Sequence, residues 1–285
     1  MTVFMYAFCA IVWGVNFVVI KIQGTPVNLE LSLTYRLGGT VLLFVAFLYL
    51  IKPRGRLSRQ DFLPIASFGI CNLALSYICL YYATIWVSAA LVTLIFSLKT
   101  VMTPIALRIC LGDRLHPRIL VGGSMGIMGV SILVYPLLMN GAGVSNLKGI
   151  AIALLGTLLT AIGDVASARN VRCGVNAMYS NSIGFAVAFI FSLMVCLIQK
   201  QSFTLPISFS YLGALMFLIV FSSFTAWMFY LKLVARIGAS ASSYMVALFP
   251  AIGGISSVII GDSAPTFYLL FGCLFSGVGA LIALR

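Results

Sequence analysis

The run TVFMYAFCAIVWGVNFVVI, residues 2–20, contains no charged side chain. It is long enough to cross a bilayer, whose hydrocarbon core takes about 20 apolar residues in a helix. Nine further apolar runs follow it, separated by short segments rich in Pro, Gly, Asn and charge. The ten predicted spans are residues 2–20, 31–51, 62–83, 87–110, 119–138, 149–168, 177–198, 210–231, 238–260 and 265–284. The sequence therefore predicts an all-α integral membrane protein with ten transmembrane helices.

The composition excludes a water-soluble protein. Hydrophobic residues make up 62% of the 285 residues and charged residues only 8%, whereas soluble domains carry about 25% charged residues. With ten spans and only short connections, three classes remain: a transporter, a membrane-embedded enzyme or a scaffold subunit. No GxxxxGK[ST] motif occurs in the chain, so the protein itself is not expected to use ATP.

The net charge of +12 is explained by orientation and requires no nucleic-acid partner, because Lys and Arg accumulate in the cytoplasmic loops of membrane proteins. With the N-terminus inside, only Lys21, Lys148 and Lys200 lie outside. The cytoplasmic basic residues are then Lys52, Arg54, Arg56, Arg59, Arg108, Arg114, Arg118, Arg169, Arg172, Lys232, Arg236 and Arg285. We therefore expect a multi-pass protein of the cell inner (plasma) membrane with both termini in the cytoplasm.

The two halves of the chain, residues 1–140 and 147–285, resemble each other. The aligned pairs are Asn16 with Asp164, Lys21 with Arg169, Asn72 with Ser223, Lys99 with Pro250, and Asp113 with Asp262. Each half has five predicted spans, an odd number, so the second half enters the membrane from the opposite side. Two inverted five-helix repeats are typical of secondary transporters that bind substrate near the midplane and work by alternating access.

Several motifs resemble those of EamA-type members of the drug/metabolite transporter superfamily. They are Trp13-Gly-Val-Asn-Phe-Val-Val-Ile-Lys21, Arg36, Ser88-Ala-Ala-Leu91, Leu111-Gly-Asp-Arg-Leu115, Gly163-Asp-Val165, and Ile237-Gly-Ala-Ser-Ala241 up to Pro250. The first motif is most similar to that of exporters of cysteine-related and other amino acids. The resemblance implies a central cavity formed by spans 1–4 and 6–9, with spans 5 and 10 providing packing. The chain departs from the family pattern at Asp113, where Glu is usual, and at Lys99, where an uncharged residue is usual. Asn16 opposite Asp164 is the third departure, because members often have a neutral residue at both positions.

Ionisable residues inside a membrane span are expensive to insert and indicate function. Lys99 lies midway through span four, where its ammonium is expected to bind a substrate carboxylate or phosphate; the alternative is an internal ion pair, most plausibly with Asp164. Asp164 in span six is the candidate for proton coupling. Burial disfavours a charged carboxylate and a neighbouring Lys favours it, so substrate at Lys99 would allow Asp164 to take up a proton. A fixed structural pair of Asp164 with Lys99 or Arg169 remains the other interpretation.

Further candidates come from polar and aromatic side chains in the spans. The predicted substrate-binding residues besides Lys99 are Trp13, Asn16, Asn72, Ser76, Tyr82, Ser223 and Tyr244. Arg36, near the start of span two, is predicted to be an anchor whose side chain reaches the outer interface. The glycines of spans five and ten allow close helix packing or a dimer contact, so the protein is expected to be a monomer or homodimer.

The sequence favours a secondary transporter of a small polar metabolite, such as an amino acid or derivative, acting as an exporter or proton-coupled exchanger. A carrier for organic anions or nucleotide-like metabolites is the alternative, which Lys99 would also suit. An intramembrane enzyme is disfavoured, because the chain lacks paired acids or a Ser/His arrangement at depth. No cofactor or metal is expected, because no CxxC pair occurs and the single His116 lies in a loop.

Overall fold

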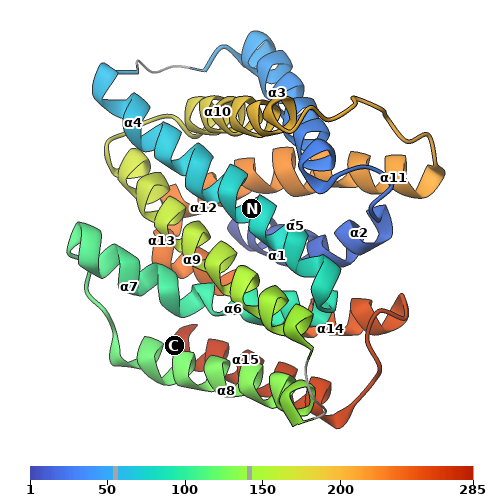
Figure 1. Ribbon diagram of the computed structural model, residues 1–285. Helices are drawn as coiled ribbons and strands as arrows, with labels where there is room; N and C mark the ends of the chain where they lie inside the picture. Colours follow the sequence, from blue (N-terminus) through green and yellow to red (C-terminus); the bar gives the residue numbers. More distant parts are fainter. Residues whose placement is uncertain (54–56, 140–142, 285) are drawn as a thin grey trace.

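The computed structural model describes residues 1–53, 57–139 and 143–284, and throughout these ranges the secondary structure is helical, with no strand (Figure 1). Eight helical stretches are long and apolar enough to cross a membrane. They are Thr2–Gln23, Leu29–Ile51, Arg59–Trp86, Ala89–Leu111, Pro117–Pro136, Val144–Arg172, Ala177–Ile198 and Phe209–Ile237. The last two predicted spans correspond to shorter apolar helices, Tyr244–Ile259 and Phe267–Gly279. The all-helical membrane fold is confirmed, and the count of ten transmembrane helices stays a prediction.

Several of these stretches are interrupted helices. The elements are α1 (Thr2–Gly14), α2 (Asn16–Gln23), α3 (Leu29–Ile51), α4 (Arg59–Phe68), η1 (Gly69–Leu75), α5 (Ser76–Trp86), α6 (Ala89–Ser97), α7 (Lys99–Leu111), α8 (Pro117–Met139), α9 (Val144–Arg172), α10 (Ala177–Ile198), α11 (Phe209–Phe217), η2 (Leu218–Thr225), α12 (Ala226–Ile237), α13 (Ala239–Ser243), η3 (Tyr244–Leu248), α14 (Phe249–Ile259) and α15 (Phe267–Leu284). The first predicted span breaks at Val15 and the fourth at Leu98. Both residues keep backbone hydrogen bonds along the chain: Val19 N–H donates to the Val15 carbonyl oxygen and Met102 N–H to the Leu98 carbonyl oxygen, each at 3.0 Å.

The third and eighth predicted spans share a different irregularity. In each, the middle of the helix widens into a π-helical segment, η1 in the first half and η2 in the second. Such segments are rare and occur frequently at functional sites. The residues that the sequence alignment pairs, Asn72 and Ser223, lie on these two segments, so the halves share a local structural feature as well as sequence motifs.

The helices pack side by side, with α8 and α15 forming a pair at one edge of the bundle (Figure 1). Glycines allow the close approach of this pair, because a Cβ on Gly129 would lie 2.6 Å from the carbonyl oxygen of Gly272. A Cβ on Gly279 would likewise lie 2.5 Å from the carbonyl oxygen of Gly122. The predicted use of these small residues for packing between spans five and ten is confirmed.

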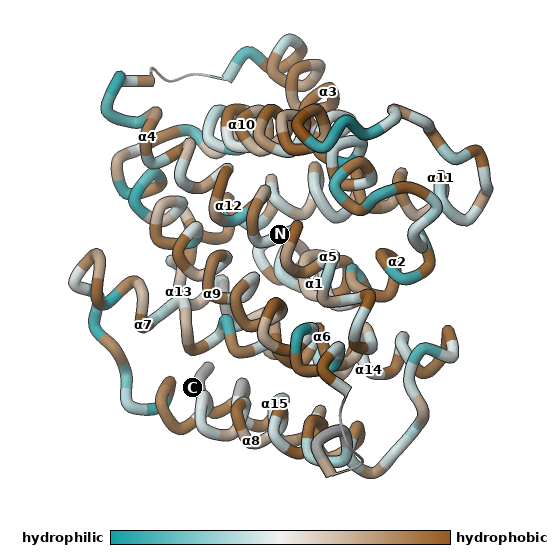
Figure 2. Tube along the Cα trace, in the orientation of Figure 1, coloured by the Kyte–Doolittle hydropathy of each residue, from teal (hydrophilic) through white to brown (hydrophobic). Residues whose placement is uncertain are grey.

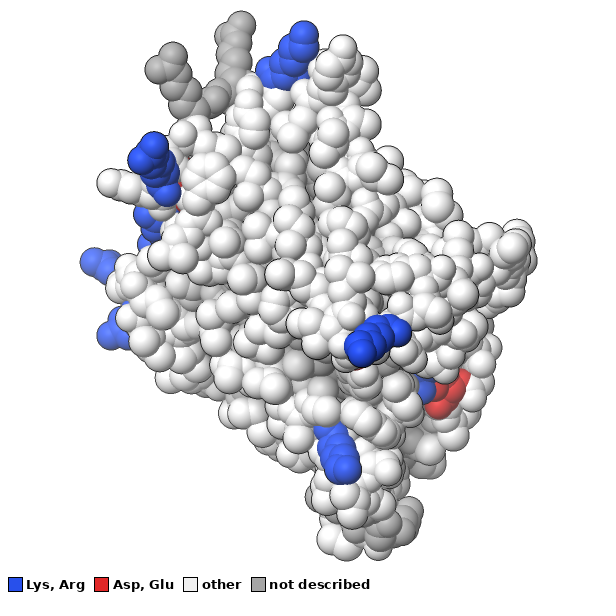
Figure 3. Space-filling view, turned by 45° about the horizontal axis from the view of Figure 1, so that its top comes forward, with Lys and Arg blue, Asp and Glu red and all other residues white. Residues whose placement is uncertain are grey.

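The distribution of polarity agrees with a membrane environment. Apolar residues predominate along the helices, and hydrophilic residues gather mainly in the connections (Figure 2). In the space-filling view, most Lys and Arg side chains lie toward the left and upper edges, and a broad area without charge covers much of the face shown (Figure 3). Large apolar side chains such as Leu42, Phe209 and Ile259 are more than 70% exposed, as expected for surfaces that face lipid.

Candidate functional site

A cavity of about 40 Å³ lies inside the bundle, with mostly apolar walls that carry a few polar and charged side chains. Its walls come from the first four predicted spans and from spans six, eight and nine. The lining residues are Trp13, Asn16, Phe17, Ile20, Arg36, Asn72, Tyr77, Leu80, Tyr81, Phe96, Lys99, Thr160, Trp227 and Phe249. A space this small holds a few waters, so a metabolite would enter only after the surrounding helices move apart.

A buried ion pair adjoins the cavity, with Lys99 as its member on the wall. Lys99 Nζ lies 3.0 Å from Asp164 Oδ2, with 3% and 1% of the two side chains exposed. Asp164 also accepts hydrogen bonds from Asn72 Nδ2 to Oδ1 (3.0 Å) and from Thr103 Oγ1 to Oδ2 (2.9 Å). The Lys99 ammonium lies 5.3 Å from the centre of the Tyr230 ring. The internal pair that the sequence offered as one interpretation of Lys99 is confirmed.

Local backbone structure places this pair. Lys99 is the first residue of α7, directly after the break at Leu98, and Thr103 follows one turn later on the same face. Asp164 lies on α9 beside Gly163, whose missing side chain leaves room for η1: a Cβ there would overlap Asn72. The glycine thus brings α9 and η1 close enough for Asn72 to donate to Asp164.

Arg36 is the second cationic group of the cavity, and its predicted role as an interfacial anchor is wrong. It is 1% exposed, because it lies two turns inside α3 on the face that packs against the bundle rather than the face toward lipid. Its Nε donates to Ser223 Oγ (2.9 Å), and Nη1 to Tyr81 Oη (3.3 Å). Nη2 donates to Asn16 Oδ1 (3.3 Å) and to Ser222 Oγ (3.1 Å).

Aromatic side chains form much of the remaining wall. The Trp13 and Trp227 rings meet edge to face with centroids 5.2 Å apart. Trp13 Nε1 donates to the Ser222 carbonyl oxygen (2.8 Å), and Trp227 Nε1 donates to Tyr77 Oη (2.9 Å). Because each indole N–H is bonded, the rings are held in place and present apolar faces to the cavity.

The structure brings most of the predicted site residues together. Trp13, Asn16, Asn72 and Lys99 line the cavity. Ser76 lies behind the wall, bonded to Thr160, and Ser223 contacts Arg36. Tyr82 and Tyr244 do not line the cavity: the Tyr82 hydroxyl donates to Glu30, and Tyr244 packs with Ile119. Their role in substrate binding stays a prediction.

Sequence reasoning did not assign several residues at or beside the cavity to the site, among them Arg36, Tyr77, Tyr81, Trp227 and Thr103. Thr103 was recognisable, because it follows Lys99 by four residues on the same helical face. Neither the burial of Arg36 nor the packing of Trp227 against Trp13 could be predicted from the sequence alone.

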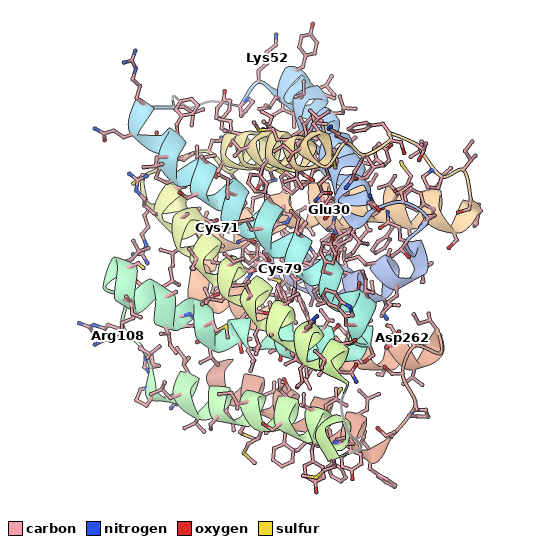
Figure 4. The ribbon with its side chains drawn as sticks, in the orientation of Figure 1. Glu30, Lys52, Cys71, Cys79, Arg108 and Asp262 are labelled. Carbon is pink, nitrogen blue, oxygen red and sulfur yellow. The ribbon has the colours of Figure 1, made fainter. Side chains whose placement is uncertain are left out.

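Two further ion pairs lie at opposite ends of the bundle. Lys21 Nζ lies 3.1 Å from Asp262 Oδ1, and Asp262 also accepts from the Ala89 backbone N–H (2.7 Å) and from Ser257 (2.9 Å). Arg172 Nη2 lies 2.6 Å from Asp113 Oδ2. Asp113 lies two residues after the end of α7, the helix that carries Arg108, and Figure 4 places Arg108 and Asp262 at opposite ends of the molecule.

The described part of the chain contains no group of three or more His, Cys, Asp or Glu side chains suited to a metal ion. Helices suited to crossing a membrane, with a cavity in their midst that carries polar and charged side chains, define a multi-pass membrane transport protein. The chain belongs to the EamA-like transporter family, which matches residues 1–135 and 147–285 as two repeats. This assignment indicates a transporter of small molecules rather than an enzyme, as the sequence motifs predicted.

The chain is also similar to one curated protein and to one solved structure. An uncharacterized transporter from Clostridium kluyveri is 20% identical over 254 residues, which cover 88% of this chain and 81% of that protein. A solved crystal structure matches with a TM-score of 0.68 and 21% identity, and covers 99% of this chain and 97% of that one. The structural match supports the fold.

Proposed function

We propose that this protein is a secondary transporter that moves a small polar metabolite, an amino acid or a derivative, across the inner (plasma) membrane by alternating access. The observation that carries the proposal is the buried Lys99–Asp164 pair beside the cavity. Charges at such depth are expensive and are retained on substrate and ion pathways. The pair joins α7 of the first half to α9 of the second, so a movement of one half against the other acts on it directly.

The three buried charges of the cavity distinguish the two repeats. Asp164 is aligned with Asn16, and Lys99 with Pro250. The alignment of Asn16 with Asp164 is an offset of 148 residues, and the same offset places Gly184 opposite Arg36. Residues that both halves need for packing would occur in both halves. These three charged residues occur in only one half each, which favours a role in substrate binding or coupling over a role in stabilising the repeat.

Asp164 is the proposed proton acceptor. The groups that face it are the Lys99 ammonium, the Asn72 amide, the Thr103 hydroxyl and the Tyr230 hydroxyl. In the described state Lys99 stabilises the carboxylate. A substrate that draws Lys99 away would leave the carboxylate without its counter-charge and favour proton uptake, which gives proton-coupled exchange.

An amino acid suits the polar groups of the cavity. Asn72 Oδ1 is buried without a hydrogen-bond partner, so it offers an acceptor beside Asp164 to a substrate ammonium. Arg36 offers a cation on another wall of the same cavity. A carrier for organic anions is the second candidate, and Arg36, which forms no ion pair among the described residues, is the observation that favours it.

The test of this function is counterflow in proteoliposomes with labelled amino acids, carboxylates and nucleosides, with protein-free vesicles as the control. We expect saturable counterflow of amino acids. Counterflow of nucleosides alone would contradict the proposed substrate class, and counterflow of none of the three would contradict the proposed transport activity.

The two ion pairs at the ends of the bundle, Lys21–Asp262 and Arg172–Asp113 (the end pairs), are proposed to close the two ends of the cavity in alternation. Lys21 and Asp262 align with Arg169 and Asp113, and Arg172, the partner of Asp113, lies one turn beyond Arg169. The pairs are therefore near equivalents in the two repeats. With both termini cytoplasmic, Lys21–Asp262 lies on the outer side, and it is the less exposed of the two pairs.

Removing one end pair should bias the protein toward opening at that end. Asp262→Asn is expected to raise access from the Lys21 side and Asp113→Asn to raise access from the other side, each by about 1.5- to 5-fold, because partly exposed pairs contribute about 0.2–1 kcal/mol. The measurement is the rate at which an impermeant maleimide labels Phe249→Cys from either side, in a background without native cysteines. Lys148→Gln, exposed in the first turns of α9, is the control. If Asp262→Asn and Asp113→Asn both raised the labelling rate from the same side of the membrane, this assignment would be refuted.

A further inference from the structure

Arg36 carries a buried charge that no acid neutralises in the described residues. It is 1% exposed, and the ion pairs of the described chain are Lys21–Asp262, Lys99–Asp164 and Arg172–Asp113. The buried acid of α3, Glu30, lies in the first turn of the helix and accepts a hydrogen bond from the Tyr82 hydroxyl. Burying a charge without a counter-charge is costly, so an anion from outside the chain would stabilise this guanidinium.

The surroundings of Arg36 orient its charge without cancelling it. Its four hydrogen bonds go to Ser223, Tyr81, Asn16 and Ser222, all of them neutral acceptors. The guanidinium carbon lies 4.5 Å from the centre of the Tyr77 ring, within cation–π range. A guanidinium has five N–H donors, so one Nη1 hydrogen remains free, and the hydroxyl acceptors can rotate toward a ligand.

The cavity as a whole is positive. Its charged lining residues are Arg36 and Lys99, and with Asp164, which pairs with Lys99, the charges sum to +1. Lys99 is already neutralised by Asp164 at 3.0 Å, so of the two cations only Arg36 is available to an anionic group while that pair is intact.

We propose that Arg36 binds the carboxylate of the transported molecule, and that the substrates are therefore small carboxylates or amino acids rather than neutral or purely cationic solutes. A planar guanidinium matches a carboxylate in a two-bond geometry that an ammonium cannot reproduce. The aromatic faces of Trp13, Trp227 and Phe249 then contact the apolar remainder of the substrate. This assignment rests on the proposed transport function and deepens it.

The binding test uses two probes of equal size, acetate and acetamide, in chloride-free buffer. Trp13 and Trp227 report binding by fluorescence, in a Trp86→Phe background that removes the third tryptophan of the chain. Acetate is expected to change the emission saturably and acetamide to bind at least about tenfold more weakly, because the amide carries no charge. Equal binding of the two probes to the native cavity would overturn the proposal without any change to Arg36.

Variants then assign the effect to Arg36. Arg36→Lys keeps the charge and loses the planar fork, and Arg36→Gln loses both. We expect acetate binding to fall about tenfold or more in Arg36→Gln and less in Arg36→Lys, with no change in Lys232→Gln, an exposed basic residue of α12. Acetate binding of native strength in Arg36→Gln would overturn the proposal. Displacement of acetate by chloride but not by leucine would also overturn it, because the site would then hold an inorganic anion.

Leucine counterflow separates this proposal from the proposed function. If the native protein exchanges leucine and Arg36→Gln does so with unchanged KM, the carboxylate assignment fails and the transport function stands. If acetate binding depends on Arg36 but neither leucine nor acetate shows counterflow, the anion site stands and the transport function fails.

Discussion

Asp164→Asn is expected to abolish pH-dependent transport and to destabilise the protein by about 3–5 kcal/mol, the usual cost of removing one partner of a buried ion pair. The substitution preserves the shape of the side chain, so hydrogen bonding with Asn72 and Thr103 can persist. What is lost is the counter-charge of Lys99, which is 2% exposed and has no other acid within ion-pair distance among the described residues. Thermal unfolding in detergent and counterflow at several pH values measure the two effects.

The matched control for Asp164→Asn is the double variant Lys99→Met/Asp164→Asn. Replacing both members of a buried pair by neutral groups is often nearly neutral for stability, because no uncompensated charge remains. We therefore expect the double variant to regain most of the stability but not the pH dependence of transport. If the single and double variants unfold at the same temperature, the predicted loss of stability does not come from the uncompensated charge of Lys99.

Gly163→Ala is the second substitution with a large expected effect. A Cβ at this position would overlap the Asn72 side chain and approach its backbone. Overpacking of this kind costs about 1–3 kcal/mol, and relief requires α9 and η1 to separate. The separation would draw Asn72 away from Asp164, so transport is expected to fall together with stability.

Gly213→Ala is the control for this prediction. Gly213 lies in α11, and nothing comes within 4 Å of a Cβ placed there. Because Ala is a better helix former than Gly by about 1 kcal/mol, Gly213→Ala should leave stability unchanged or raise it. Equal losses at the two glycines, measured by thermal unfolding and counterflow, would rule out close contact at Gly163 as the cause.

The sequence predicted the helical fold well, because hydropathy over some 20 residues reports burial in lipid directly. It did not predict the interruptions at Val15 and Leu98 or the π-helical segments η1 and η2. These local departures depend on how each helix packs against its neighbours, and the hydropathy of a single apolar run carries no information about that packing.

The site, like the fold, contains features that the sequence predicted and features that it did not. Lys99 and Asp164 were predictable as a pair because Asp164 is the one acid of the chain deep enough in a span to reach Lys99. Arg36 was misplaced because its distance from the start of a span says nothing about which way the side chain turns. In the structure it turns inward, where Asn16, Ser222 and Ser223 from distant segments receive its N–H groups.

The most direct test of the proton-coupling role of Asp164 is the proton movement that accompanies amino-acid flux in proteoliposomes containing a trapped pH indicator. The native protein is predicted to move protons in step with a saturable flux of amino acid. Asp164→Asn, reconstituted in equal amount and verified as folded, is predicted to show no substrate-dependent proton movement. Proton movement of native size per transported molecule in Asp164→Asn would contradict the account, because the carboxylate would then have no part in coupling.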